Sequence, residues 1–152
     1  MNKIFKQRKT VRSFSDQGIE VAMLEEILEA ANSAPSAGNL KARDIIVVAE
    51  DEIKSLLAKA AFDQNQIREA PAVLVFVALP EVSAKKYGER GKNLYAIQDA
   101  TLAAGFAWLQ AVDLGLAGGW IGGFEEAEVK KILGFKGNQK PIAIIPIGYS
   151  TQ

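Results

Sequence analysis

Three short segments of this chain contain side chains or backbone suited to holding a charged, flat ligand. The first, near the start, brings together two guanidinium groups, an ammonium group and a hydroxyl: Arg8, Lys9, Thr10 and Arg12. Arginine forms bidentate, charge-assisted hydrogen bonds with phosphate oxygens, so this cluster favours a phosphate group. A solvated basic surface, or a tail that binds a polyanion, is the alternative interpretation of the same residues.

The other two segments are marked by residues that shape the backbone. One closes a predicted helix and contains Pro35, Ser36, Ala37, Gly38 and Asn39. Residues 115–124 read GLAGGWIGGF, and five of the first nine residues are glycine. Glycine lets backbone approach a flat ligand closely, but costs about 0.5–1 kcal/mol per residue in a regular element. The alternative for residues 35–39 is an ordinary helix-ending turn. The alternative for residues 115–124 is a tight helix-to-strand crossover packed against a helix.

The chain contains no cysteine and no histidine. This composition excludes disulfides, thiol catalysis, Cys/His metal sites and a Ser–His triad. A site made of carboxylates alone stays open, but no acidic spacing indicates one, and we predict no metal. The glycine-rich segment follows a helix and lacks a Gly-Lys-Ser/Thr sequence, so it is neither a Rossmann fingerprint nor a Walker loop. If the protein is an enzyme, we expect an organic cofactor to supply the difficult chemistry.

Length and composition indicate a globular protein of one domain. We expect residues 1–152 to form a single domain, since 49% of the residues are hydrophobic and 24% charged. Eighteen basic and 18 acidic residues cancel, which gives no support for a nucleic-acid or membrane partner. The most apolar stretch, residues 100–112, is too short to span a bilayer. No signal peptide is evident, and we expect a cytoplasmic protein.

The hydrophobic pattern predicts helices that alternate with strands. Val21, Leu24, Ile27, Leu28 and Ala31 form one face of a helix that ends before Pro35. Further predicted helices cover residues 51–62, 93–114 and 125–133, and predicted strands cover residues 45–49, 72–79 and 141–149. The second of these strands has no polar alternation and is therefore expected to be buried on both faces. Residues 80–91 are polar and give no clear pattern.

The longest predicted helix carries small and apolar residues at spacings of three and four: Leu94, Ile97, Thr101, Ala104, Trp108 and Ala111. This face is expected to pack in the core and is compatible with a subunit interface. The elements together predict an α+β or α/β sandwich with three or four strands.

Six motifs occur in an order that resembles the nitroreductase family of flavin enzymes, and they span nearly the whole chain. The basic segment fits R-x-S/T-x-R/K-x-F at Arg8, Thr10, Arg12 and Phe14, and P-S-x-x-N occurs at Pro35, Ser36 and Asn39. Ala70-Pro71 precede the buried strand, and Gln98-Asp99-Ala100 open the long helix. Residues 115–124 fit G-L-x-x-x-W-I-G-x-F, and residues 146–149 read P-I-G-Y.

The resemblance implies an α/β/α sandwich with a central, mostly antiparallel sheet. It also implies an intertwined homodimer with FMN at the subunit interface. Arg8, Lys9 and Thr10 would hold the phosphate and the ribityl chain. Arg12 would face N1 and O2 of the flavin, where a fixed cation stabilises the anionic reduced ring.

The remaining cofactor residues implied by the resemblance lie beside the isoalloxazine ring. From the partner subunit these would be Pro35, Ser36, Ala37 and Asn39. From the glycine-rich segment they would be Trp120, Ile121, Gly122 and Gly123, with the backbone N–H of Gly122 or Gly123 directed at N5.

The chain departs from the family pattern in two places. Where many members continue Asn-x-Gln-Pro-Trp, this chain has Asn39 followed by Leu40, Lys41, Ala42 and Arg43, and Lys41 or Arg43 is expected to add positive charge near the ligand. Members usually extend past G-Y with an arm that wraps the partner. Here three residues follow Tyr149, which predicts weaker FMN binding and a smaller dimer contact.

The resemblance implies an FMN-dependent oxidoreductase without a catalytic side chain of its own. NADH or NADPH would deliver hydride to flavin N5, and a nitroaromatic, quinone or similar acceptor would take it up in turn. A flavin-dependent dehalogenase, a flavin-degrading enzyme and a non-catalytic flavin-binding dimer are the alternatives. An anion- or nucleic-acid-binding module that uses residues 3–12 is a further, disfavoured alternative.

Overall fold

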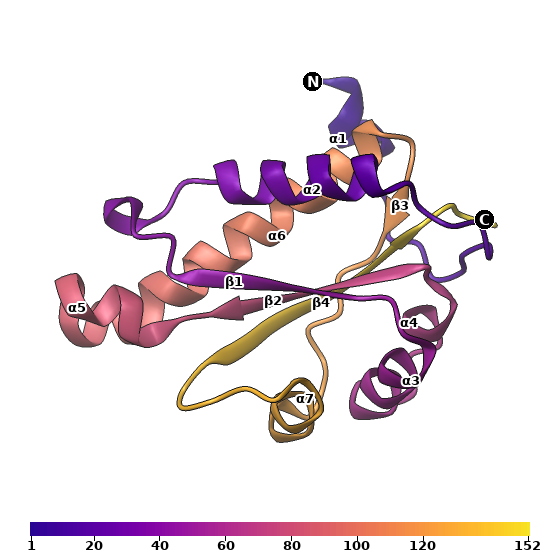
Figure 1. The fold of residues 1–152 in the computed structure, drawn as a ribbon. Helices are drawn as coiled ribbons and strands as arrows, with labels where there is room; N and C mark the ends of the chain where they lie inside the picture. Colours follow the sequence, from indigo (N-terminus) through magenta and orange to yellow (C-terminus); the bar gives the residue numbers. More distant parts are fainter.

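The computed structural model describes all residues, Met1 to Gln152, as a three-layer α+β sandwich (Figure 1). The sheet is antiparallel with strand order β1-β2-β4-β3: β1 (Arg43–Val48), β2 (Ala72–Ala78), β4 (Lys140–Gly148) and β3 (Ala117–Gly118). One face is covered by α2 (Val21–Ser33) and α6 (Ala96–Asp113). The other is covered by α3 (Asp51–Ala60), α4 (Gln66–Glu69) and α7 (Glu126–Leu133). The predicted fold class is confirmed.

Strand β2 is the centre of the molecule, and all seven of its residues are buried. Val73 and Val75 pack into the core under α3 and α7, while Leu74 and Phe76 pack into the core under α2 and α6. This alternation follows from the two-residue period of a strand, and the absence of polar residues reflects helices on both faces. The prediction of a strand buried on both faces is therefore confirmed.

Helix α6 is the longest helix, and its first turns have an irregular backbone. The predicted helix over residues 93–114 begins as the π-helical segment η2 (Gly91–Tyr95) and becomes regular at Ala96. Before it, α5 (Pro80–Arg90) fills the region that the hydrophobic pattern left open. Pro80 suits the start of α5, because the first turn of a helix has no internal partner for its N–H groups. Gly88, with φ of 56°, breaks α5 before η2.

Residues 13–15 lie beside the last residues of the chain at one end of the sheet (Figure 1). After α1 (Lys3–Gln7), residues 8–15 are extended. Ser15 N donates to Tyr149 O at 2.9 Å, and Thr151 N donates to Ser13 O at 3.3 Å. The short helix η1 (Ala37–Asn39) follows α2 at the opposite end of the molecule. No helix has the length and apolar character that crossing a membrane requires.

Candidate functional site

The basic segment and the glycine-rich segment meet in the folded chain, although about 110 residues separate them in the sequence. Thr10 and Gly118 form a parallel β-bridge, and Val11 N donates to Gly118 O at 3.0 Å. A Cβ added to Gly119 would lie 3.0 Å from Val11 O, so the two backbones touch directly. Two of the three segments singled out by their chemistry therefore form one surface.

The cations of the basic segment are free of carboxylate partners. None of the four ion pairs in the structure includes Arg8, Lys9 or Arg12. The guanidinium of Arg8 lies 4.7 Å from the ring centroid of Trp108, which fixes its position without neutralising its charge. Lys9, Thr10 and Arg12 are exposed. The segment thus carries uncompensated positive charge on a fixed backbone.

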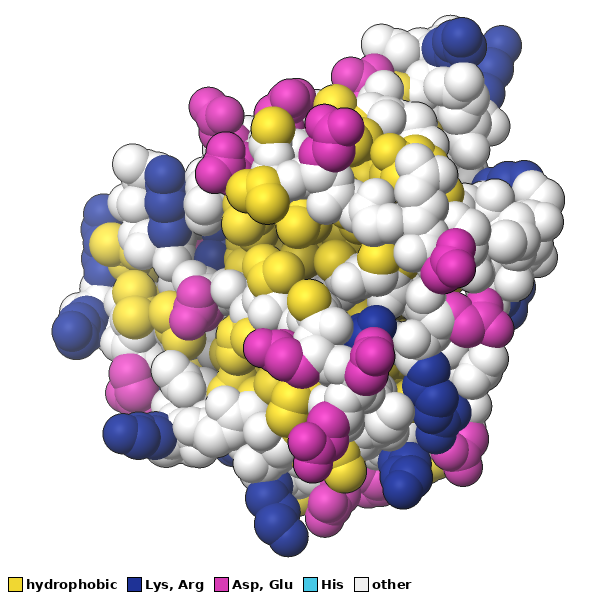
Figure 2. All heavy atoms as spheres, turned by 45° about the vertical axis from the view of Figure 1, so that its right-hand side comes forward, with side chains coloured by type: hydrophobic (Ala, Val, Ile, Leu, Met, Phe, Trp, Pro, Cys, Tyr) yellow, Lys and Arg dark blue, Asp and Glu magenta, His cyan; other side chains and the backbone are white.

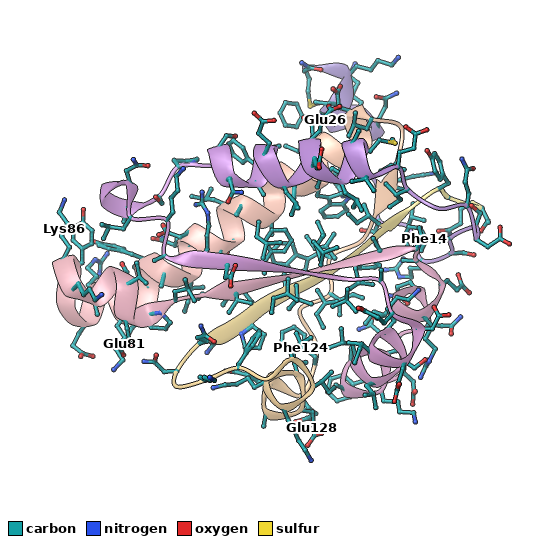
Figure 3. All side chains as sticks on the ribbon, in the orientation of Figure 1. Phe14, Glu26, Glu81, Lys86, Phe124 and Glu128 are labelled. Atoms are coloured by element: carbon teal, nitrogen blue, oxygen red, sulfur yellow. The ribbon has the colours of Figure 1, made fainter.

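Two aromatic residues of the motifs anchor this surface to the core (Figure 3). Phe14 is 6% exposed, and its N donates to Glu69 Oε2 at 3.1 Å. Phe124 packs against the same core cluster at the end of the glycine-rich segment. Each of the two segments is therefore held by its own buried ring.

The glycines differ in what the fold requires of them. Gly115 has φ of 83°, a backbone conformation that favours glycine. A Cβ at Gly118 would lie 3.0 Å from Trp108 Nε1 and 3.2 Å from Pro146 O. The crossover interpretation is correct for this first half. In the second half, a Cβ at Gly123 would meet only Phe62 Cε2 at 3.9 Å, and both Gly122 and Gly123 are exposed.

Ile121 anchors the second half of the segment. Its N donates to Ile144 O at 3.0 Å and its O accepts from Ile144 N at 2.9 Å. The Ile121 side chain is 3% exposed and lies in the core. On either side, Trp120 is 38% exposed and Gly122 is exposed, so these neighbours form the solvent-accessible part of the segment.

The third segment forms a tight turn against the start of α6. Asp99 Oδ1 accepts from Ala37 N and Asp99 Oδ2 accepts from Ala42 N, both at 3.1 Å. Lys41 N donates to Ser36 Oγ at 3.0 Å. A hollow of about 490 Å³ opens beside the turn and is lined by Pro35, Ser36, Ala37, Tyr95, Gln98, Asp99, Thr101 and Leu102.

Within one chain this turn does not reach the glycine-rich segment. Asp99 holds the turn near the start of α6, whereas Trp108 contacts Arg8 and Gly118 nine residues later. At 1.5 Å per residue, these helix positions are separated by about 13 Å. Figure 1 accordingly shows η1 and the extended residues after α1 at opposite ends of the molecule.

The prediction that Arg43 adds positive charge near the ligand is wrong, because its side chain is buried. It is 7% exposed, and its guanidinium donates to the carbonyls of Asn32, Ala34, Pro35 and Asp99 at 2.8–3.2 Å. Burial lowers the pKa of Arg43, and the nearby Asp99 carboxylate opposes that shift. The guanidinium of Arg43 therefore binds backbone carbonyls inside the fold and does not face a ligand. Lys41, in contrast, is exposed.

The sequence pattern that defines the Nitroreductase family matches residues 5–87 and 62–149, which together cover nearly the whole chain. This chain belongs to the nitroreductase family. A "NADH dehydrogenase" of Thermus thermophilus is 30% identical over 96% of this chain and 84% of its own length. An "Iodotyrosine deiodinase" of Haliscomenobacter hydrossis is 25% identical over 95% of this chain and 77% of its own.

Solved structures show the same nitroreductase fold. Nitroreductase A from Vibrio parahaemolyticus superposes with a TM-score of 0.90 at 28% identity, covering 100% of this chain and 69% of that one. An FMN-dependent nitroreductase from Clostridium difficile superposes with a TM-score of 0.86 at 28% identity, covering 100% of this chain and 88% of that one. The predicted family is therefore confirmed by sequence and by fold.

Sequence reasoning missed one pair in this nitroreductase-family chain, Arg43 and Asp99. The sequence places Asp99 in a motif without predicting a role for it, and it predicts Arg43 as a candidate cation near the ligand. The signal available was an isolated acid among the alanines of an apolar helix, since a buried carboxylate needs hydrogen-bond donors. Which donors it meets depends on the tertiary fold.

Proposed function

We propose that two copies of this chain bind two molecules of FMN and pass hydride from NADH or NADPH to a nitroaromatic, quinone or similar acceptor. The observation that carries the proposal is the surface where a basic segment without carboxylate partners touches the glycine-rich segment, in which Gly123 has no packing reason to be glycine. Oxidoreductases of this family, including the FMN-dependent one from Clostridium difficile, support the assignment. The flavin, when bound, would accept and release the hydride.

The phosphate end of FMN would bind at the basic segment. Arg8, Lys9 and Thr10 offer two cations and a hydroxyl, and no carboxylate competes for them. Each charge-assisted hydrogen bond to phosphate contributes about 1.5–3 kcal/mol before screening. Arg12 would hold its charge beside N1 and O2 of the pyrimidine, where positive charge favours the reduced anion.

The ring end would lie along Trp120, Gly122 and Gly123, held in place by Ile121. Exposed backbone without a Cβ fits close approach of a flat ring, and the structure gives no packing reason for glycine at Gly123. The backbone N–H of Gly122 or Gly123 would donate toward N5.

The turn that contains Pro35, Ser36, Ala37 and Asn39 would complete the site from the second chain. The separation of this turn from the glycine-rich segment within one chain favours such an arrangement. Leu102 and Phe106 on the outer face of α6 are 41% and 39% exposed, and Leu102 also lines the hollow beside the turn. A dimer that buries this face would remove these apolar side chains from water.

The test is a titration of apo-protein with FMN, followed by absorbance and by the mass of the assembly. We expect saturable binding of one FMN per chain and oxidation of NADH or NADPH when an acceptor is present. A protein that shows no saturable flavin binding would contradict the proposal. Flavin binding without reduction by NADH or NADPH would instead favour a non-catalytic flavin-binding dimer.

A second candidate is reductive dehalogenation, which the similarity to an iodotyrosine deiodinase favours. The same flavin site would serve both reactions. Product analysis with a halogenated phenol and with a nitroaromatic distinguishes them, because only dehalogenation releases halide.

A further inference from the structure

The turn proposed to complete the flavin site has an unfavourable backbone. Gly38, Asn39 and Lys41 have φ of 60°, 55° and 49°, and two of these three are not glycine. Left-handed conformations of residues other than glycine are unfavourable and persist only where the surroundings impose them. Within the turn, only a few hydrogen bonds to Ser36 and Ala37 oppose this cost.

The surrounding support comes from two buried charged residues. The two carboxylate oxygens of Asp99, which is 2% exposed, accept from both ends of the turn, at Ala37 N and Ala42 N. The Arg43 guanidinium binds the carbonyls that lead into the turn from α2 and ties them to Asp99 O. Because a buried, unpaired polar group is costly, this network strongly favours a single backbone arrangement.

We propose that Arg43 and Asp99 are positioning residues for the flavin site, holding the turn that contains Ser36 and Asn39 in the conformation that meets FMN in the second chain. This inference rests on the proposed function. Neither residue would contact the flavin, since Asp99 is 2% exposed with both carboxylate oxygens bound to backbone N–H groups, and the Arg43 guanidinium is surrounded by carbonyls. Both would act through the backbone they hold.

The decisive variant is Asp99→Asn, which preserves volume but leaves one acceptor oxygen for two backbone donors. The amide NH₂ would face a donor, so one end of the turn should loosen. FMN would then bind only after the loosened turn is ordered, so we expect FMN affinity to fall about 10- to 100-fold. The measurement is the FMN dissociation constant at a temperature where the variant is fully folded.

A matched control removes a buried charge elsewhere. Lys54 is 5% exposed, and its Nζ donates to Ala70 O at 2.9 Å, on the far side of the sheet from the turn. Lys54→Met should lower the free energy of unfolding while leaving the FMN dissociation constant within about twofold. Equal losses of affinity in both variants would show that general stability is responsible, and would overturn the inference.

A double-mutant cycle separates positioning from a general effect. Asn39→Ala removes a side chain that the turn presents to the ligand. If Asp99 acts through the turn, the effects of Asp99→Asn and Asn39→Ala on FMN affinity will be non-additive, whereas Lys54→Met and Asn39→Ala will be additive. Additive effects in both cycles would overturn the inference.

Failure of the inference differs from failure of the proposed function. If the unmodified protein binds no FMN, the proposed function itself is wrong. If it binds FMN and Asp99→Asn binds equally well, only the inference is wrong. If Asp99→Asn does not fold, Arg43→Lys replaces it, because lysine keeps the charge but lacks the planar guanidinium. Additive effects of Arg43→Lys and Asn39→Ala on FMN affinity would then overturn the inference.

Discussion

Gly119 and Gly123 belong to the same segment, but only the first is required by packing. Gly119→Ala places a Cβ 3.0 Å from Val11 O, so we expect the free energy of unfolding to fall by about 1–3 kcal/mol. Gly123→Val should change stability by less than about 0.5 kcal/mol, since Gly123 is exposed and its Cβ position meets only Phe62. Urea unfolding of the apo-proteins measures both effects.

In an FMN titration we expect the opposite order, with Gly123→Val losing more flavin affinity than Gly119→Ala. Gly123→Val blocks close approach to the exposed backbone, so we expect flavin affinity to fall while the fold stays intact. A Gly123→Val protein with unchanged FMN affinity would remove Gly123 from the proposed site.

Arg12 tests the electrostatic part of the proposal. Its guanidinium has no carboxylate partner, so Arg12→Gln removes a charge without stranding another. We expect the two-electron midpoint potential of bound flavin to become more negative by about 30–60 mV, because about 30 mV corresponds to a tenfold change in the equilibrium. Lys59→Gln, an exposed cation on α3, is the control and should leave the potential unchanged. Equal potentials in Arg12→Gln and the unmodified protein would exclude this role.

How far the sequence predicts the site depends on whether a residue acts alone or through others. For cations and glycines, the residue type alone indicates what they can bind. The structure places the basic and glycine-rich segments together. Their contacts with FMN stay predictions. Arg43 could not be assigned from its type, because its partners are carbonyls brought together by α2 and α6. Asp99 has the same dependence on the tertiary fold.

At the scale of elements, prediction succeeds where hydrophobic period and burial agree. The sequence predicted α2, α3, α6, α7 and the three long strands within a few residues. It did not predict α5, since this helix is largely polar and is interrupted at Gly88. It also contained no signal for β3, a strand of only two residues that depends on pairing with β4.

Helix α6 is the element on which the proposed dimer is tested. Phe106→Asp puts a charge on its exposed apolar face, where a second chain would have to desolvate it. We expect the assembly to fall to the mass of a monomer, with loss of FMN binding, as measured by light scattering and titration. Leu56→Asp is the matched control, because Leu56 on α3 is 40% exposed against 39% for Phe106. If Phe106→Asp stays dimeric, this face of α6 is not the interface.

At the scale of the whole molecule, the chain carries no net charge, because its 18 basic and 18 acidic residues cancel. Figure 2 shows apolar side chains across the middle of one face, with carboxylates around them and cations mainly at the periphery. This pattern agrees with 18 basic and 18 acidic residues in the sequence and gives no continuous basic surface on that face. A chain without net charge gives a polyanion no long-range attraction, so the cations of the basic segment suit one small anion.

The split of the candidate site between the two ends of the molecule has a thermodynamic consequence. If FMN joins the basic segment of one chain to the turn of another, it binds only the folded assembly and must stabilise it. At a free concentration 100 times the dissociation constant, the expected gain is about 2.7 kcal/mol. For about 150 residues this raises the melting temperature by several degrees, as measured by calorimetry.

The melting temperature should also rise with protein concentration, because unfolding would separate two chains. A gain from FMN without any dependence on protein concentration would place the whole site within one chain, contrary to the proposed dimer.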